Sequence, residues 1–190
     1  MPPASADLPP ERVDAGAVIL RRIRATDAGD VAAAVSASLD HLRPWMPWAT
    51  PDAADRRSQL SRVAEADEMW ESGISHIYSV VTADQGTLVG EIGLHRRVGD
   101  GSIEIGYWIA GSQVRRGFGT SAAEAITGVA LALPGVSQVE IHCDEANTAS
   151  AAIPRKLGYR LDRIAVRKPE APGESGRLMI WVAERGDGQP

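Results

Sequence analysis

A short glycine-containing segment of the chain has the residues of an anion-binding turn. It comprises Val114, Arg115, Arg116, Gly117, Phe118, Gly119 and Thr120, between a strand-like run and an alanine-rich run with helical spacing. The two glycines remove side chains from the turn, so that backbone N–H groups converge on one point. The start of the following helix adds unpaired N–H groups and a partial positive charge, and the two arginines add full charges. These features predict a cradle for a pyrophosphate; the alternative is an ordinary strand-to-helix turn that needs glycine.

The same turn differs from two common nucleotide-binding turns. A dinucleotide-binding fingerprint has a third glycine and lies in a chain-opening βαβ unit, and neither is present here. The lysine and hydroxyl of a P-loop are also missing. A domain that binds ATP or NAD is therefore disfavoured.

A second segment, residues 147–159, has the features of a capped helix. Asn147 has the side chain of an N-cap, and Ser150 follows one turn later on the same side of the helix. Gly158 ends the helix, and Tyr159 begins the next strand. On its own, the segment is equally well explained as an amphipathic helix with no further role.

The elements that must hold these two segments are predicted from hydrophobic periodicity and turn residues. Strands are expected over 18–24, 77–81, 88–94, 103–109, 138–143, 159–166 and 178–182, and helices over 30–35, 52–71, 119–132 and 147–157. The order β-α-α-β-β-β-α-β-α-β-β predicts a mixed α/β fold, with about seven strands flanked by about four helices. Residues 1–16, with four prolines, are expected to form a flexible arm before a single domain at 17–185, and residues 186–190 a frayed end.

Taken together, the two segments resemble the Gcn5-related N-acetyltransferase (GNAT) superfamily. Its acetyl-CoA motif is (Q/R)-x-x-G-x-(G/A) followed by a helix, and Gly117-Phe118-Gly119 is similar to it. Its second motif is N-x-x-(S/A) ending in K-L-G-(F/Y), which resembles Asn147, Ser150 and Lys156-Leu157-Gly158-Tyr159. The separation of the two motifs along the chain also fits that superfamily.

Two further segments resemble the RimJ/RimL branch, which acetylates protein N-termini among other amines. Residues 103–109 look like its fourth strand and residues 41–48 like its substrate-side loop, so the resemblance extends over residues 18–182. It implies a GNAT fold with a mostly antiparallel sheet. It also implies an enzyme that moves an acetyl or related short acyl group from acyl-CoA to a primary amine. The acceptor implied first is a protein N-terminal α-amine, and second a small amine such as an antibiotic or polyamine.

The resemblance also implies which residues bind acetyl-CoA as a cosubstrate. The turn would hold the pyrophosphate, and the splayed end of the 103–109 strand would pair with the pantetheine amides. A backbone N–H near Ile109 would meet the developing oxyanion. The cofactor-binding residues expected on this basis are Trp108, Ile109, Arg115, Arg116, Gly117, Phe118, Gly119, Thr120 and Asn147.

The chain departs from the superfamily pattern at two positions. Val114 stands where the first motif has glutamine or arginine, which removes a side-chain contact but leaves the backbone cradle. Pro154 stands where many members have a tyrosine that protonates the leaving thiolate, and proline has no group that donates. In the RimL-like branch a serine at the Ser150 position serves the leaving sulfur, so the resemblance assigns that catalytic role to Ser150. The two departures motivate an alternative, a non-catalytic CoA-binding or sensor module on the same fold.

An amine acceptor must lose a proton, because an ammonium group is mostly protonated at neutral pH. A carboxylate near the amine, directly or through water, is a suitable base. Glu104 is the expected catalytic base, since on a strand its side chain points away from the apolar face of Ile103 and Ile105. Glu91 and His95, on the preceding strand, are its rivals.

An unusually aromatic group of residues precedes these strands in a chain with only one Phe. It consists of Trp45, Met46, Trp48 and Trp70 and would suit an acceptor pocket. With Glu91 attracting a cationic amine, the expected substrate residues are Trp45, Trp48 and Glu91. The alternative is that the tryptophans close the core between the first helices or form a dimer interface.

Composition limits the partners and the compartment. The net charge of −5 and the pI of about 5.4, without clustered basic residues, exclude a nucleic-acid-binding surface. No apolar run approaches the ~20 residues that span a bilayer, and the N-terminus has no signal-peptide features, so no membrane partner is expected. The single cysteine, Cys143, is expected to be a buried, passive thiol in a cytoplasmic protein. The four histidines lack ligand spacing, so no metal site is expected.

Overall fold

The structure of the protein, a computed structural model, describes residues 8–186. Within this range the strands are β1 (Arg12–Ala15), β2 (Val18–Arg22), β3 (Ser75–Thr82), β4 (Leu88–His95), β5 (Ser102–Ile109), β6 (Gln138–Asp144), β7 (Arg160–Val166) and β8 (Arg177–Glu184). The helices are α1 (Ala28–Ser36), α2 (Leu39–Leu42), α3 (Arg56–Glu71), α4 (Phe118–Ala132) and α5 (Thr148–Lys156). Short 3-10 turns are η2 (Ala25–Asp27), η3 (Asp52–Ala54) and η4 (Gly111–Gln113).

The described strands form one sheet in the order β1-β2-β3-β4-β5-β6-β8-β7. Every neighbouring pair is antiparallel except β5 and β6, which run parallel. The predicted mixed α/β fold with a mostly antiparallel sheet is therefore confirmed, with one strand more than expected.

The additional strand is β1, which corrects the predicted extent of the N-terminal arm. Arg12–Ala15 pairs antiparallel with β2 across a turn at Gly16, whose φ of +71° lies in the left-handed region. Residues 12–15 of the arm predicted for residues 1–16 are therefore part of the sheet. A four-residue edge strand with alternating exposed and half-buried side chains carries too little apolar periodicity to be recognised in the sequence. Residues 1–7, and residues 187–190 of the predicted frayed end, lie outside the described residues.

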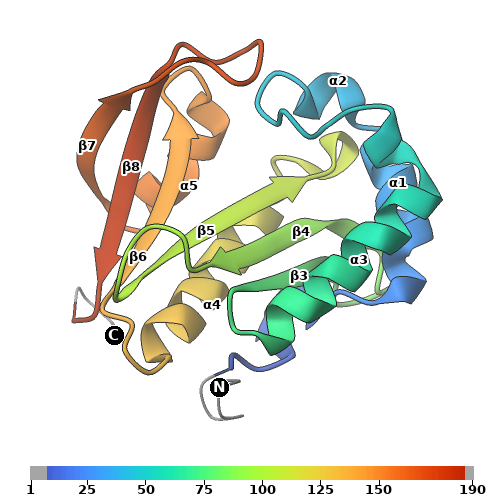
Figure 1. The fold of residues 1–190 in the computed structure, drawn as a ribbon, viewed down its shortest axis with the longest axis horizontal. Helices are drawn as coiled ribbons and strands as arrows, with labels where there is room; N and C mark the ends of the chain where they lie inside the picture. The colour runs from blue at the N-terminus through green and yellow to red at the C-terminus, as the bar shows by residue number, and fades with distance from the viewer. Residues whose placement is uncertain (1–7, 187–190) are drawn as a thin grey trace.

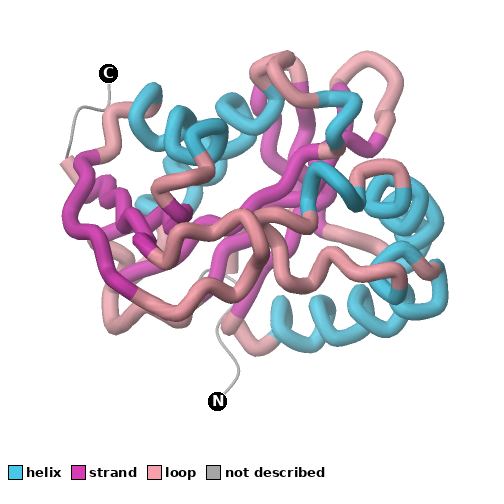
Figure 2. The backbone as a smooth tube through the Cα atoms, turned by 90° about the horizontal axis from the view of Figure 1, so that it is seen from above, coloured by secondary structure: helices cyan, strands magenta, loops and turns pink. Residues whose placement is uncertain are grey.

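Helices cover both faces of the sheet (Figures 1 and 2). On one face α4 buries Ile126 in the same apolar cluster as Ile105 of β5. On the other face Val35 of α1 and Val63 of α3 pack in a second cluster with Trp108. Because side chains alternate along a strand, β5 supplies the core of one face and the lining of the other.

β5 and β6 diverge half-way along their length. Their parallel pairing ends at Ile105 and Ile141. β5 stays paired with β4 as far as Ile109, and β6 stays paired with β8 as far as Asp144, so each diverging half is held from its other side. Figure 1 shows the resulting opening, with β5 and β6 pointing apart. The inner edges of the opening present backbone groups that the parallel ladder does not use.

A buried carboxylate links β2, β3 and the start of α1. Asp27 accepts hydrogen bonds from the Arg21 guanidinium at 2.7 and 2.8 Å, from the Arg24 N–H at 2.9 Å and from the Ser79 hydroxyl at 2.9 Å. Burial by itself raises the pKa of a carboxyl, but these donors outweigh it and hold the pKa of Asp27 below its ordinary 3.8. The network fixes the entry into α1, which forms part of the cavity wall described below.

We predict that Asp27→Asn lowers the free energy of unfolding by about 2–3 kcal/mol, because the half-buried Arg21 guanidinium loses its charged partner at a buried position. The stabilisation by Asp27 is complete above the ordinary pKa of 3.8 and is lost as the pH falls through the lower folded pKa. The variant should therefore lose less stability on acidification than the wild type, which urea unfolding at neutral and acidic pH measures. Asp162→Asn, which breaks exposed pairs with Arg160 and Arg163, is the control and should leave the midpoint unchanged. Equal effects of the two substitutions would contradict the prediction.

Candidate active site

The turn predicted to bind an anion leads directly into α4. It follows η4, and Arg115 and Gly117 both adopt left-handed conformations, with φ of +62° and +84°. Such a conformation is uncommon for a residue with a Cβ, and left-handed residues in a turn direct successive N–H groups toward one side. The Ser121 N–H donates to the Gly117 carbonyl at 3.0 Å, and the N–H groups of the residues before Ser121 have no partner inside the helix. This is the geometry of an anion-binding turn.

Packing holds this turn against β5 and α5. The Arg116 guanidinium lies 4.7 Å from the centre of the Phe118 ring. A Cβ on Gly119 would lie 3.4 Å from Ile109 Cγ1 of β5 and 3.2 Å from Ile153 Cδ1 of α5. Glycine at this position therefore lets the start of α4, the end of β5 and α5 meet in one place.

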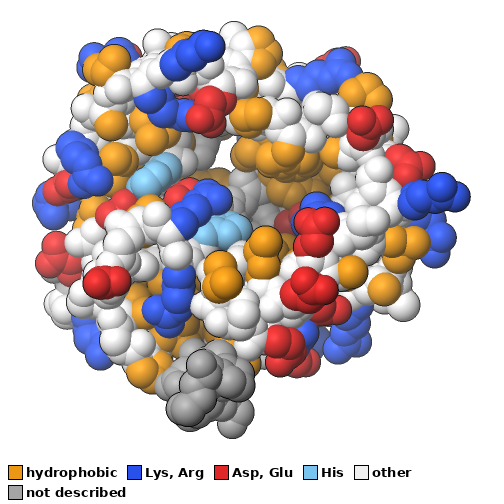
Figure 3. All heavy atoms as spheres, in the orientation of Figure 1, with side chains coloured by type: hydrophobic (Ala, Val, Ile, Leu, Met, Phe, Trp, Pro, Cys, Tyr) orange, Lys and Arg blue, Asp and Glu red, His pale blue; other side chains and the backbone are white. Residues whose placement is uncertain are grey.

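A cavity of about 560 Å³ lies beside the opening between β5 and β6. Figure 3 shows the hollow in the middle of this face, with charged and histidine side chains on its rim. Its walls come from α1, α3, β3, β4, β5, β6, the start of α5, the loop after α2 and the loop between β7 and β8 with the start of β8. The predicted residues that line it together are Trp45, Trp48, Glu91, Glu104, Trp108, Asn147 and Ser150. The other predicted residues form the adjoining strand end and turn and are not part of this lining: Ile109, Arg115, Arg116, Gly117, Phe118, Gly119 and Thr120.

The aromatic residues predicted to form an acceptor pocket divide between two places. Trp45 and Trp48 line the cavity, and Trp48 packs edge-on against Trp108 with ring centroids 6.0 Å apart. Trp70 is instead 2% exposed and packs against Tyr78 in the core, with ring centroids 5.0 Å apart. Trp70 is therefore a core residue, which was the alternative to an acceptor pocket for these tryptophans.

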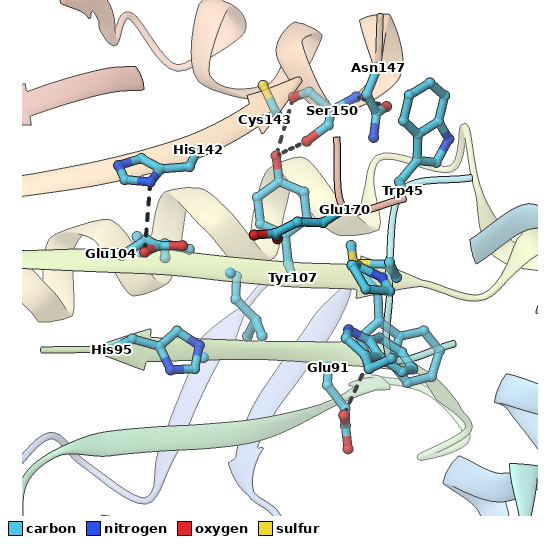
Figure 4. A pocket seen from close by; sticks show the side chains of 18 of the residues that line it. Trp45, Glu91, His95, Glu104, Tyr107, His142, Cys143, Asn147, Ser150 and Glu170 are labelled. Atoms are coloured by element: carbon cyan, nitrogen blue, oxygen red, sulfur yellow. Dashed lines mark hydrogen bonds and ion pairs between the residues drawn. The ribbon is translucent and has the colours of Figure 1, made fainter. Parts of the chain in front are cut away.

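Glu104 is held in a bidentate ion pair. Its oxygens accept from Nε and Nη2 of Arg97 at 2.8 and 2.7 Å, and His142 Nδ1 lies 3.8 Å away (Figure 4). Burial favours the neutral carboxyl, but Arg97 and His142 outweigh it and lower the pKa of Glu104 below its ordinary 4.5. The side chain is therefore an ionised carboxylate at neutral pH.

The two rivals of Glu104 are also hydrogen-bonded. Glu91 is 6% exposed, and one oxygen accepts from Arg62 while the other accepts from the Trp108 indole N–H at 3.0 Å. Burial lowers the pKa of His95 to about 4, so its imidazole is neutral at neutral pH, with Nδ1 2.9 Å from the Ser75 hydroxyl. Glu91 is therefore placed to hold Arg62 and the Trp108 ring.

Ser150 lies in the first turn of α5, facing β5. Its N–H donates to Asn147 Oδ1 at 3.1 Å, which confirms Asn147 as the N-cap. The Tyr107 hydroxyl lies 3.2 Å from both the Ser150 hydroxyl and the Ser150 carbonyl oxygen (Figure 4). Cys143 is buried on the adjoining β6, and burial raises the pKa of its thiol to about 11, which leaves it protonated and unreactive at neutral pH.

Tyr107 and Glu170 are among the polar cavity residues that were not predicted from the sequence. Tyr107 belongs to a run that was recognised only as a strand, and Glu170 to a polar loop without periodicity. The Glu170 side chain is 65% exposed, and its Oε2 pairs with Arg167 at 2.7 Å. Both reach the cavity through contacts between distant parts of the chain, so no local signal marks them.

Residues 8–186 contain neither a cluster of metal-ligating side chains nor a helix suited to span a membrane. No group of three or more His, Cys, Asp or Glu side chains there is placed to hold a metal ion. Among the helices of that range, none combines the length and the apolar character needed to cross a membrane.

Comparison with known proteins decides the family. A model of the family described as acetyltransferase (GNAT) domain matches residues 17–160 of the 190-residue chain. The chain belongs to this family. The GNAT membership predicted from the two motifs is thereby confirmed, whereas no curated protein matches the sequence.

Several solved acetyltransferases share the fold of this GNAT domain. The ribosomal-protein-S5-alanine acetyltransferase of Vibrio fischeri aligns with a TM-score of 0.82 at 16% identity, over 94% of this chain and 99% of its own. RimJ of Mycobacterium smegmatis, in complex with a CoA disulfide, aligns with a TM-score of 0.81 at 24% identity, over 91% and 84%. MccE, the microcin C7 self-immunity acetyltransferase in complex with acetyl-CoA and AMP, aligns with a TM-score of 0.84 at 14% identity, over 95% and 100%. Similarity at this level is one of fold, and it agrees with the RimJ/RimL-like resemblance.

Two loops of the chain meet at the cavity (Figure 1). The Gly173 N–H, between β7 and β8, donates to the Pro44 carbonyl in the loop after α2 at 2.8 Å. Asp144 anchors the first loop by accepting from the N–H groups of Ser175 and Gly176 at 2.9 and 3.0 Å. A Cβ on Gly173 would lie 2.7 Å from the Pro44 oxygen, so the contact requires glycine.

We predict that Gly173→Ala breaks this contact and lowers the free energy of unfolding by about 1–3 kcal/mol, because the added methyl group displaces Pro44. Thermal unfolding measures the loss. Gly29→Ala is the matched control, since its Cβ would lie 3.8 Å from Arg56 Nε and alanine suits a helix better than glycine. Acetyl-CoA affinity should change by less than about twofold, because the loop contact and the α4 turn share no partners. A stable Gly173→Ala variant would show that the contact is dispensable.

Proposed function

We propose that the protein is an acyl-CoA-dependent N-acetyltransferase that moves an acetyl group from acetyl-CoA to a primary amine. The observation that carries this proposal is the opening between β5 and β6, which lies beside the anion-binding turn of α4. A cosubstrate with a pyrophosphate at one end and amides along its arm suits both features. RimJ and MccE, which share the fold, were solved with a CoA disulfide and with acetyl-CoA.

The residues proposed to bind acetyl-CoA form a continuous path. The N–H groups of the α4 turn, with Arg115 and Arg116, bind the pyrophosphate. The backbone of β5 from Trp108 to Ile109 takes the pantetheine amides as a substitute for the absent strand partner. An N–H near Ile109 stabilises the oxyanion, and Asn147 fixes the start of the helix beside it.

The proposed reaction is direct transfer. The amine nitrogen attacks the thioester carbonyl carbon, the C–S bond breaks, and the amide and CoA are the products. Glu104 accepts the proton of the amine through water, because its carboxylate is ionised and lines the cavity. Ser150 donates a hydrogen bond to the leaving sulfur, a function that Pro154 cannot supply.

Glu170 is the second candidate for the base. Its side chain is 65% exposed, against 11% for that of Glu104, and its ion pair with Arg167 is formed by Oε2. Glu91 is a weaker candidate, because one of its oxygens accepts the Trp108 indole N–H of the cavity wall at 3.0 Å and only 8% of its side chain is exposed. We therefore assign Glu91 to the substrate side as the residue that holds Trp108 in the cavity wall.

The acceptor enters along the side of the cavity that Trp45 and Trp48 line. A protein N-terminal α-amine is the first candidate, which the ribosomal-protein acetyltransferase of Vibrio fischeri supports. A small amine is the second, which the complex of MccE with AMP supports. The alternative remains a non-catalytic CoA-binding module, motivated by Val114 and Pro154; it would bind acetyl-CoA without releasing thiol.

We expect calorimetry to show micromolar binding of acetyl-CoA, with ATP and NAD bound far more weakly. The double variant Arg115→Ala/Arg116→Ala should weaken acetyl-CoA binding by about tenfold, because two phosphate-binding cations are lost. Arg160→Ala/Arg163→Ala removes two arginines from β7 and should leave the affinity unchanged. Absence of acetyl-CoA binding by the wild type would refute the proposed function, and binding without thiol release across peptide and small amines would favour the sensor alternative.

We expect Glu104→Gln to lower the rate of thiol release by about 100-fold, as for loss of a general base. Acetyl-CoA affinity should be retained, because Glu104 lies outside the turn. Glu170→Gln is the matched substitution and should reduce the rate only slightly. The reverse result, with the large loss in Glu170→Gln, would assign the base to the β7–β8 loop.

A further inference from the structure

Tyr107 and Ser150 form a hydroxyl pair where the diverging half of β5 faces the start of α5. The Tyr107 hydroxyl lies 3.2 Å from Ser150 Oγ and 3.2 Å from the Ser150 carbonyl oxygen. Both side chains are half-buried and line the cavity. Figure 4 shows the Tyr107 hydroxyl directed at Ser150.

Pro154 explains why a tyrosine hydroxyl reaches the backbone of a helix. In a regular helix the N–H of residue 154 would donate to the Ser150 carbonyl, but proline has no N–H. The Tyr107 hydroxyl lies within hydrogen-bond distance of that carbonyl oxygen and takes the place of the missing donor. Because both Ser150 oxygens lie 3.2 Å away, the single Tyr107 proton is shared between the Ser150 carbonyl and Ser150 Oγ as a three-centre hydrogen bond. Tyr107 is the donor to both oxygens, so the Ser150 hydroxyl keeps its own proton for another acceptor.

We propose that Tyr107 is a positioning residue for the leaving group, because its hydroxyl holds the Ser150 hydroxyl in the orientation that presents it to the CoA sulfur. The proposal rests on the proposed acetyl transfer. When the tetrahedral intermediate collapses, the C–S bond breaks and its electron pair goes to sulfur. Ser150 donates a hydrogen bond to this thiolate and keeps its proton, and the thiolate takes a proton from water.

The thiol and the phenols around the pair stay protonated near neutral pH. Burial raises the pKa of Cys143 to about 11 and that of Tyr159 to about 12, and it also raises the pKa of Tyr107. Asp144 and Glu170 lie on the same cavity wall, the first bonded to the Ser175 and Gly176 N–H groups and the second paired with Arg167. A thiolate signal that appears at lower pH than the titration of Cys143 therefore comes from the thiol of bound CoA.

The test is the acidity of the CoA thiol bound to the full-length protein, followed by the ultraviolet absorbance of the thiolate as the pH rises. Free CoA titrated in the same buffer is the reference, and we expect the thiol of CoA bound to the wild type to have a lower pKa than the thiol of free CoA. Ser150→Ala should make the bound thiol about tenfold less acidic, and Tyr107→Phe about threefold to tenfold. The double variant should match Ser150→Ala alone, because Tyr107 acts only through Ser150.

Tyr78→Phe is the matched control, since its hydroxyl donates to the Pro10 carbonyl at 2.9 Å and Tyr78 does not line the cavity. It should leave the acidity of the bound thiol unchanged. Additive effects in the double variant would show a separate role for Tyr107 and overturn the proposal, as would an unchanged thiol in Tyr107→Phe. A wild type that fails to bind CoA would overturn the proposed function and this inference together, whereas the variant results bear on the inference alone.

Discussion

The site depends on where the pairing between β5 and β6 stops. A parallel pair bonded along its full length would leave no opening and no unused backbone groups at Ile109. The divergence is tolerated because β4 and β8 hold the two halves from outside. At Gly90 the β5 backbone approaches so closely that a Cβ would collide with the Trp108 carbonyl, so β4 needs glycine to keep the end of β5 in place. The α4 turn, the cavity and α5 are all arranged around this one interruption of the sheet.

The charges around the cavity are balanced in pairs. Glu104 is matched by Arg97 and Glu91 by Arg62, and a buried carboxylate is stable in this form only while its partner remains. The cavity is therefore lined by fixed carboxylates and by the Trp45 ring. The two ion pairs add no large net charge to it, either positive or negative. The sequence predicted that Glu91 attracts a cationic amine, but its carboxylate is already paired with Arg62. The shape of the cavity, which the two loops set, is therefore a stronger basis for the choice of acceptor than charge attraction.

The sequence predicted those parts of the site whose conformation depends on residues close together in the chain. The turn at Gly117 and the cap at Asn147 depend on residues within one helical turn, and the sequence marks both. Tyr107 and Glu170 reach the cavity only because strands and loops far apart in the chain come together, so no spacing rule identifies them. The same limit applies to Trp70, which is chemically equivalent to Trp45 in the sequence but lies in the core. β1 was missed for a different reason, since a short edge strand has almost no periodicity.

Pro154 shows how a local rule and a distant contact combine. The proline removes both a helical N–H and the tyrosine that many superfamily members have there, which on sequence grounds weakens the case for catalysis. In the folded chain the vacant Ser150 carbonyl is met by the hydroxyl of Tyr107, which comes from a strand. The cavity thus keeps a tyrosine hydroxyl beside the catalytic serine proposed here, supplied by β5 and not by α5. β5 also carries the backbone proposed to bind pantetheine. Any shift of this diverging strand therefore moves the cosubstrate and the Tyr107 hydroxyl together. The hydrogen bonding around the leaving sulfur thus depends on how far β5 and β6 are apart.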